Sequence, residues 1–152
     1  MKLAEALIQR ANNQKRLEQL KQRILRNALV QEGDSPAEEP MPLVRESEQI
    51  SAELVALVQR INRTNSSTDM EGEVTVADAI ARRDGLRTRA TLYRELAAAA
   101  TVTTNRYSTA EIKFRPAVSV EDMQRQADEY AREYRDLDLR LQELNWAIEL
   151  LE

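Results

Sequence analysis

The last third of the chain carries an uninterrupted stripe of mostly apolar residues at alternating steps of four and three. Its members are Met123, Ala127, Tyr130, Tyr134, Leu137, Leu141, Leu144, Ile148 and Leu151. A stripe that repeats every 3.5 residues stays on one side of a helix only when the helix winds into a left-handed coiled coil. The stripe therefore predicts a helix over residues 120–151, about 50 Å long at a rise of about 1.5 Å per residue, with a seam that another helix covers.

Three weaker apolar patterns predict three more helices, over about residues 2–28, 43–62 and 76–101. In each of them, apolar residues recur three or four positions apart, the spacing that places them on one helix face. Only 3 of the 152 residues are glycine, and alanine, leucine, glutamate and arginine are abundant, as is typical of long helices. A chain of this length suits one domain, so we expect residues 1–152 to form a single helical domain.

Three polar stretches separate the predicted helices. Residues 30–42 contain three of the four prolines among several acidic residues, so we expect an acidic linker that is neither helix nor inner strand. Residues 68–75 hold Gly72 at a tight turn and predict a small β-hairpin. Residues 109–118 alternate polar and apolar side chains, which predicts a short strand that ends near Pro116.

Together these elements define the expected fold class. It is all-α, with long antiparallel helices forming a coiled-coil bundle and a small β-hairpin or strand element at the inner breaks. The stripe of the last helix is then the seam of the core or of an oligomer. Trp146 lies off this stripe, either in a second contact surface or within a bundle thick enough to bury it.

Charge is distributed unevenly along the chain, although the formal net charge is only −4. Residues 1–28 carry seven basic residues against two acidic ones, whereas residues 117–152 carry four arginines against ten acidic residues. We expect the basic first helix and the acidic last helix to be neighbours. Exposed ion pairs contribute only about 0–1 kcal/mol each, so the charges select partners while the apolar seam holds the helices together.

The absence of cysteine and histidine excludes much chemistry. Without cysteine there is no disulfide, thiolate nucleophile or iron–sulfur cluster. Without histidine there is no common general base, no Ser-His-Asp triad and almost no catalytic zinc site. The sequence therefore predicts a protein that is not an enzyme and that needs neither a cofactor nor a metal.

Membranes and nucleic acids are poor partners for this chain. No apolar run approaches the roughly 20 residues that a membrane-spanning helix needs, and the first ten residues lack the apolar core of a signal peptide. A cytoplasmic location is therefore expected. The net charge is negative and no basic patch is interleaved with aromatic residues, which argues against nucleic-acid binding.

Arginines gather around the second break and its neighbours. Arg63, Arg82, Arg83 and Arg106 would form a candidate site for a small anion or a nucleotide phosphate near the start of a helix, where free N–H groups favour negative charge. The alternative is that these arginines pair with nearby carboxylates and fix loops or a contact between subunits. The second interpretation is favoured, because structural ion-pair networks are common.

Several short segments, distributed over nearly the whole chain, are distinctive: MKLAEAL (1–7), QEGD (31–34), PAE (36–38), RINRTN (60–65), AIARRD (79–84), RYS (106–108), EIKF (111–114) and QELNW (142–146). Through these segments the chain resembles a bacterial family of uncharacterised helical proteins, often labelled septicolysin-like. The resemblance implies a small, helical, oligomeric bacterial protein. It brings no established activity, cofactor or catalytic residue.

Three hypotheses for function follow. The first is a structural or interaction protein that acts as a coiled-coil homo-oligomer, since the apolar stripes exceed what one thin bundle needs. The second is a small-anion or nucleotide-phosphate binding protein that uses the arginine cluster. The third is the membrane-active protein that the family label suggests, which the polar first helix disfavours.

Overall fold

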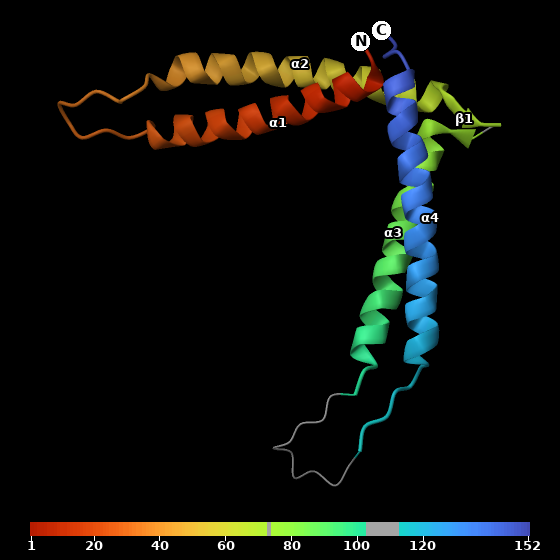
Figure 1. Ribbon diagram of the computed structural model, residues 1–152. Coiled ribbons are helices and arrows are strands. Elements are labelled where there is room, and N and C mark those ends of the chain that lie inside the picture. The colour runs from red at the N-terminus through yellow and green to blue at the C-terminus, as the bar shows by residue number, and fades with distance from the viewer. Residues whose placement is uncertain (73, 103–112) are drawn as a thin grey trace. The chain divides into compact units, whose positions relative to one another are not determined.

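The computed structural model describes residues 1–72, 74–102 and 113–152. Along this part of the chain, shown in Figure 1, the elements follow in the order α1 (Leu3–Arg26), α2 (Pro40–Ser67), β1 (Asp69–Glu71), β2 (Val74–Thr75), α3 (Val76–Ala99) and α4 (Val120–Ala147). The prediction of an all-α protein with a small β-hairpin is confirmed. The chain divides into two compact units: the first contains residues 1–75 and 142–152, and the second contains residues 76–141.

In the first unit, α1 and α2 pack side by side as an antiparallel pair (Figure 1). Their direction follows from two ion pairs, because Arg16 contacts Glu46 of α2 whereas Arg23, further along α1, contacts the earlier Glu38. Leu20 is fully buried. Arg16 and Arg23 thus find acidic partners in α2 and its preceding linker, whereas Lys2, at the start of α1, pairs with Glu149 of the acidic last segment.

The start of α2 corrects the predicted linker of residues 30–42. The helix begins at Pro40, so the linker occupies residues 27–39 and two prolines belong to the first helical turn. Proline is tolerated there because the first N–H groups of a helix have no partner within the helix, and its fixed φ suits the helical backbone.

The end of α2 also differs from the prediction, since the helix continues to Ser67 instead of ending at Asn62. The surroundings of Thr64 account for the longer helix. Its side chain is fully buried, and its hydroxyl donates a hydrogen bond to the main-chain oxygen of Arg60 at 2.8 Å. A polar residue that sequence propensity assigns to a turn is therefore satisfied inside the helix.

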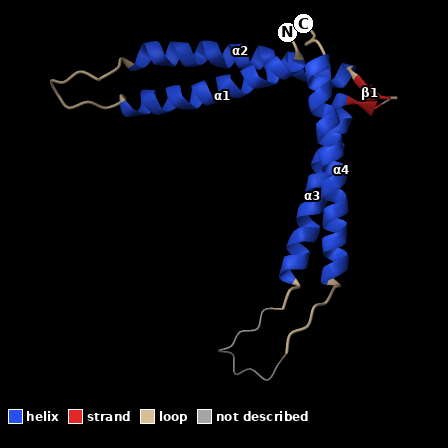
Figure 2. Cartoon of the chain, viewed as in Figure 1, coloured by secondary structure: helices blue, strands red, loops and turns tan. Residues whose placement is uncertain are grey.

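The β-hairpin predicted over residues 68–75 is present, as the strands in Figure 2 show. Asp69 pairs with Thr75, and Gly72 turns the chain with a φ of 64°. The strand predicted over residues 109–118 is not seen where it can be examined: residues 113–118 form a loop, and residues 109–112 lie outside the described residues. Pro116 lacks the N–H that a strand would donate.

The two chain ends lie together in the first unit. Lys2 forms an antiparallel bridge with Glu149, in which the N–H of Leu3 donates to the oxygen of Ile148 at 3.0 Å and the N–H of Leu150 to the oxygen of Met1 at 2.9 Å. The core of this unit contains Leu3, Ala6, Leu57, Ile61 and Leu150, with Leu7 and Ile148 packed against it.

This bridge corrects the last residues of the predicted seam. The helix ends at Ala147, so Ile148 and Leu151 lie beyond it in extended chain. In extended chain, alternate side chains point to opposite sides. Ile148 and Leu150 therefore face the core, whereas Leu151 is 41% exposed.

In the second unit, α3 and α4 form another antiparallel pair (Figures 1 and 2). Arg83 of α3 contacts Asp138 of α4 at 3.0 Å, whereas the later Tyr93 contacts the ring of the earlier Tyr130, with 5.7 Å between the ring centroids. Ser119 caps the start of α4, because the N–H of Asp122 donates to its hydroxyl at 3.2 Å. The seam positions from Met123 to Leu144 are half-buried or buried.

Candidate functional site

An apolar groove runs along α1 in the first unit. It has a volume of about 430 Å³ and is lined by Gln14, Leu17, Glu18, Lys21, Ile24 and Leu25 of α1, with Ser47 of α2. Leu25 is 60% exposed, and Leu17 and Ile24 are half-buried. Positions three and four apart share a helix face, so this surface runs along one side of α1, where Ser47 of α2 borders it.

Two opposite charges lie near the middle of the groove. The ammonium of Lys21 is 3.9 Å from the carboxylate of Glu18, and both side chains are more than 60% exposed. Glu18 also accepts a hydrogen bond of 2.9 Å from the side-chain amide of Gln22. At this separation and exposure the pair within the helix is weak, so each charge remains open to a partner outside the chain.

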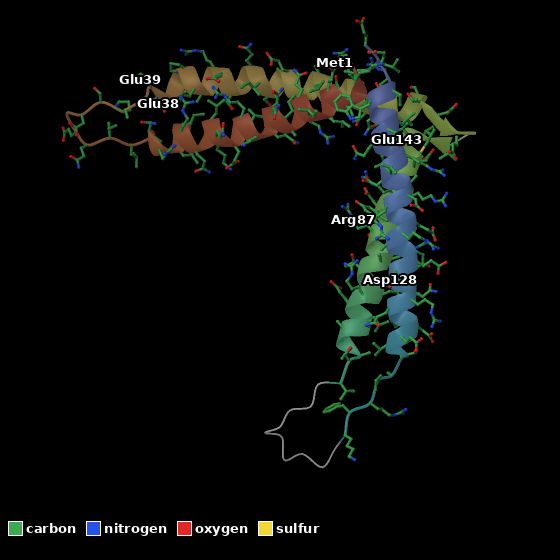
Figure 3. All side chains as sticks on the ribbon, in the orientation of Figure 1. Met1, Glu38, Glu39, Arg87, Asp128 and Glu143 are labelled. Carbon is green, nitrogen blue, oxygen red and sulfur yellow. The ribbon has the colours of Figure 1, made fainter. Side chains whose placement is uncertain are left out.

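Two arginines of α1 that lie outside the groove lining are paired with carboxylates. Arg16 donates to Glu46 at 2.6 and 3.1 Å, and Arg23 forms a two-point contact with Glu38. Figure 3 labels Glu38 at the end of the α1–α2 pair that is distant from the chain termini. The hydrogen bond with Arg23 lowers the pKa of the Glu38 carboxyl, and the same bond raises the pKa of Arg23. The groove therefore lies on a helix whose excess positive charge is partly compensated.

The second unit holds a smaller cavity of about 180 Å³. Arg82, Leu86, Glu133, Asp136, Leu137 and Arg140 line it. Two carboxylates thus oppose two guanidinium groups within the lining, and this balance of charge gives no preference for an anion.

The four arginines of the predicted anion site have different surroundings. Arg63, in the first unit, donates to the main-chain oxygen of Glu152. Arg83, in the second unit, is held by Asp84 at 2.9 Å and by Asp138 at 3.0 Å. Burial lowers the pKa of Arg83, but the hydrogen bonds to these two carboxylates outweigh it and raise the pKa. Arg82 lines the small cavity, and Arg106 lies outside the described residues.

The aromatic part of the predicted seam is used within the second unit. Besides the contact between Tyr93 and Tyr130, the guanidinium of Arg89 lies 5.7 Å from the ring of Tyr130, and that of Arg87 lies 5.9 Å from the ring of Tyr134. Figure 3 labels Arg87 on α3 beside α4. In this unit the tyrosines therefore bind α3 to α4. Trp146, off the seam, is 56% exposed.

Sequence reasoning did not single out the groove. The available signal was the stripe of Gln14, Leu17, Lys21 and Ile24, which steps 3-4-3 and shares Leu17 and Ile24 with the apolar pattern that predicted the first helix. Only two of these four residues are apolar, so the stripe does not stand out by hydropathy. It is recognised once the structure shows Leu20 fully buried while Leu17 and Ile24 stay half-buried and Leu25 exposed.

Neither a membrane span nor a metal centre emerges from residues 1–72, 74–102 and 113–152. No helix in these ranges is both long enough and apolar enough to cross a membrane. The same residues contain no group of three or more carboxylates arranged to hold a metal ion.

These features define a small helical protein built on two helix pairs. Over residues 10–150 the chain matches a family of unknown function (DUF6847), and it belongs to that family. It is similar to a functionally unknown conserved protein from Corynebacterium diphtheriae, whose crystal structure shares 45% identity over 99% of each chain, with a TM-score of 0.94. No curated protein matches the chain. The uncharacterised helical family is thus confirmed, whereas the septicolysin-like label finds no support.

Proposed function

We propose that this protein is a structural or interaction protein that acts as a homo-oligomer. The observation that carries the proposal is the groove on α1, where apolar side chains stay in contact with solvent although the helix already packs on α2. Removing apolar surface from water contributes about 25 cal/mol per Å², so a helix placed in the groove would stabilise an assembly.

The thickness of the first unit supports the same conclusion. Two packed helices cover each other along one stripe, and other large apolar side chains of the pair remain in solvent. Ile8 of α1 is 53% exposed, and Met41 and Val55 of α2 are 59% and 55% exposed. Apolar surface of this extent on a helix pair is typical of proteins that complete their core through association.

The proposal gives the chain no catalytic role. The sequence contains neither histidine nor cysteine, so the residue types that most often serve as general base and nucleophile are missing. Interaction through helix surfaces needs none of these residues.

Sedimentation velocity over a wide concentration range tests the proposal. We expect a species larger than one chain at micromolar concentrations, with a sedimentation coefficient that falls on dilution. A single monomeric species from micromolar to high micromolar concentration would contradict it.

A further inference from the structure

We infer that the groove on α1 binds the same groove of a second copy, with the two α1 helices antiparallel about a two-fold axis. The inference rests on the proposed function and names the surface and the register. A two-fold interface uses one patch twice, so this patch must be complementary to itself. The groove meets this requirement, because its lining contains apolar, acidic and basic side chains from one helix.

The charges fix the register. Glu18 and Lys21 are three residues apart on the exposed face of α1. An axis that passes midway between them, with the helices antiparallel, places Glu18 of each copy opposite Lys21 of the other. One acidic and one basic residue then produce two attractive contacts. A parallel arrangement would instead place each charge level with its own counterpart, which is repulsive.

The apolar residues fit the same register. In this register Gln14 of one copy is level with Leu25 of the other. At a rise of about 1.5 Å per residue, Leu17 lies only about 3 Å along the axis from Ile24 of the second copy. The aliphatic stem of Lys21 covers the apolar surface between them while its ammonium reaches the carboxylate. The lining residues of α1 thus all find a partner across the axis.

The excess positive charge of α1 does not oppose this arrangement strongly. Arg16 and Arg23 are paired with Glu46 and Glu38, and Lys2 contacts Glu149 at 2.7 Å. A uniformly acidic helix from another protein is a less suitable occupant, since it would meet the carboxylate of Glu18 inside the groove. Both signs of charge in one groove favour a second copy.

A charge exchange tests the register. Glu18→Lys makes both cross-axis contacts repulsive, and so does Lys21→Glu, whereas the double variant restores two attractive contacts with the signs reversed. Sedimentation equilibrium should show about tenfold weaker association for each single variant and near wild-type association for the double variant. The matched control is Lys15→Glu, which reverses an exposed base of α1 outside the groove lining and should change association little.

The outcomes separate this inference from the proposed function. Circular dichroism should show unchanged helix content in every variant, because Glu18 and Lys21 are exposed. If the wild type associates but the single variants equal the Lys15→Glu control, the register is wrong while self-association stands. If the single variants weaken association and the double variant does not recover it, the register is also wrong. If the wild type stays monomeric, both proposals are overturned.

Discussion

The buried hydroxyl of Thr64 accepts a hydrogen bond from the main-chain N–H of Leu151, with 3.0 Å between Oγ1 and N. The same hydroxyl donates to the main-chain oxygen of Arg60 at 2.8 Å, so one atom joins two turns of α2 to the C-terminal segment. Arg60 supports this junction through a hydrogen bond of 3.1 Å from its Nε to the main-chain oxygen of Leu151. A single polar side chain thus ties residues that are 87 positions apart in the sequence.

We expect Thr64→Val to destabilise the protein by about 1–3 kcal/mol. The variant keeps the shape of the side chain but leaves the N–H of Leu151 without its acceptor in a partly buried site, and an unsatisfied buried donor costs about that much. Urea unfolding followed by circular dichroism measures the change.

Thr88→Val is the matched control for this variant. Its hydroxyl also donates to a main-chain oxygen four residues earlier, that of Asp84, but the site is exposed. We expect a change within about 0.5 kcal/mol. Equal losses for the two variants would show that the junction at Thr64 contributes no special stability.

Two leucines of α4 make a second comparison. Leu141 is 1% exposed, whereas Leu139, two residues earlier, is 61% exposed. We expect Leu141→Ala to cost about 2–5 kcal/mol, because it removes buried methyl groups and leaves a cavity. Leu139→Ala should cost less than about 1 kcal/mol, since its side chain already meets water. Denaturant unfolding of both variants checks this, and a reversed order would contradict the buried face assigned to α4.

Much of this fold can be predicted from the sequence because periodicity and turn chemistry are local signals. The four helices, the hairpin at Gly72 and the cap at Ser119 all follow from spacing and residue type. What could not be predicted depends on tertiary contact. The extra turn of α2 after Asn62 is accompanied by the burial of Thr64 against the C-terminal segment, which propensity does not include.

The end of α4 and the choice of helix partners illustrate the same limit. The heptad stripe continues through Leu151, but the chain leaves the helix after Ala147 to bridge Lys2, a residue at the other end of the sequence. Charge content alone also did not predict Glu46 and Glu38 as the partners of Arg16 and Arg23, although Lys2 pairs with Glu149 of the acidic last segment. The groove on α1 was not predicted from the sequence, because its stripe mixes apolar and charged residues.

The anion hypothesis gives a third prediction. Arg83 is held by Asp84 and Asp138, and Arg63 by the main-chain oxygen of Glu152, so a phosphate would have to displace existing partners. We expect the melting temperature in millimolar phosphate to equal the melting temperature in sodium chloride of the same ionic strength. A concentration-dependent rise specific to phosphate, lost in Arg82→Gln, would restore the anion site, since a ligand of the folded state raises stability by mass action.

The ion pair between Arg23 and Glu38 makes stability depend on pH. The hydrogen bond from Arg23 lowers the pKa of Glu38 in the folded protein below its ordinary value of 4.5. A depressed folded-state pKa means that the contribution is fully present above the ordinary value and is lost as the pH falls through the lower, folded value. Both side chains are partly exposed, so the contribution is small and decreases with salt.

Glu38→Gln removes this dependence. We expect the free energy of unfolding of the variant to lie below that of the wild type at neutral pH, and the difference to vanish in acid and at high salt. Urea unfolding at a series of pH values measures both effects. Glu32→Gln, at an exposed position in the same linker, is the matched control and should follow the wild type throughout. A difference that persists at low pH would show that the substitution alters packing at the linker instead of charge.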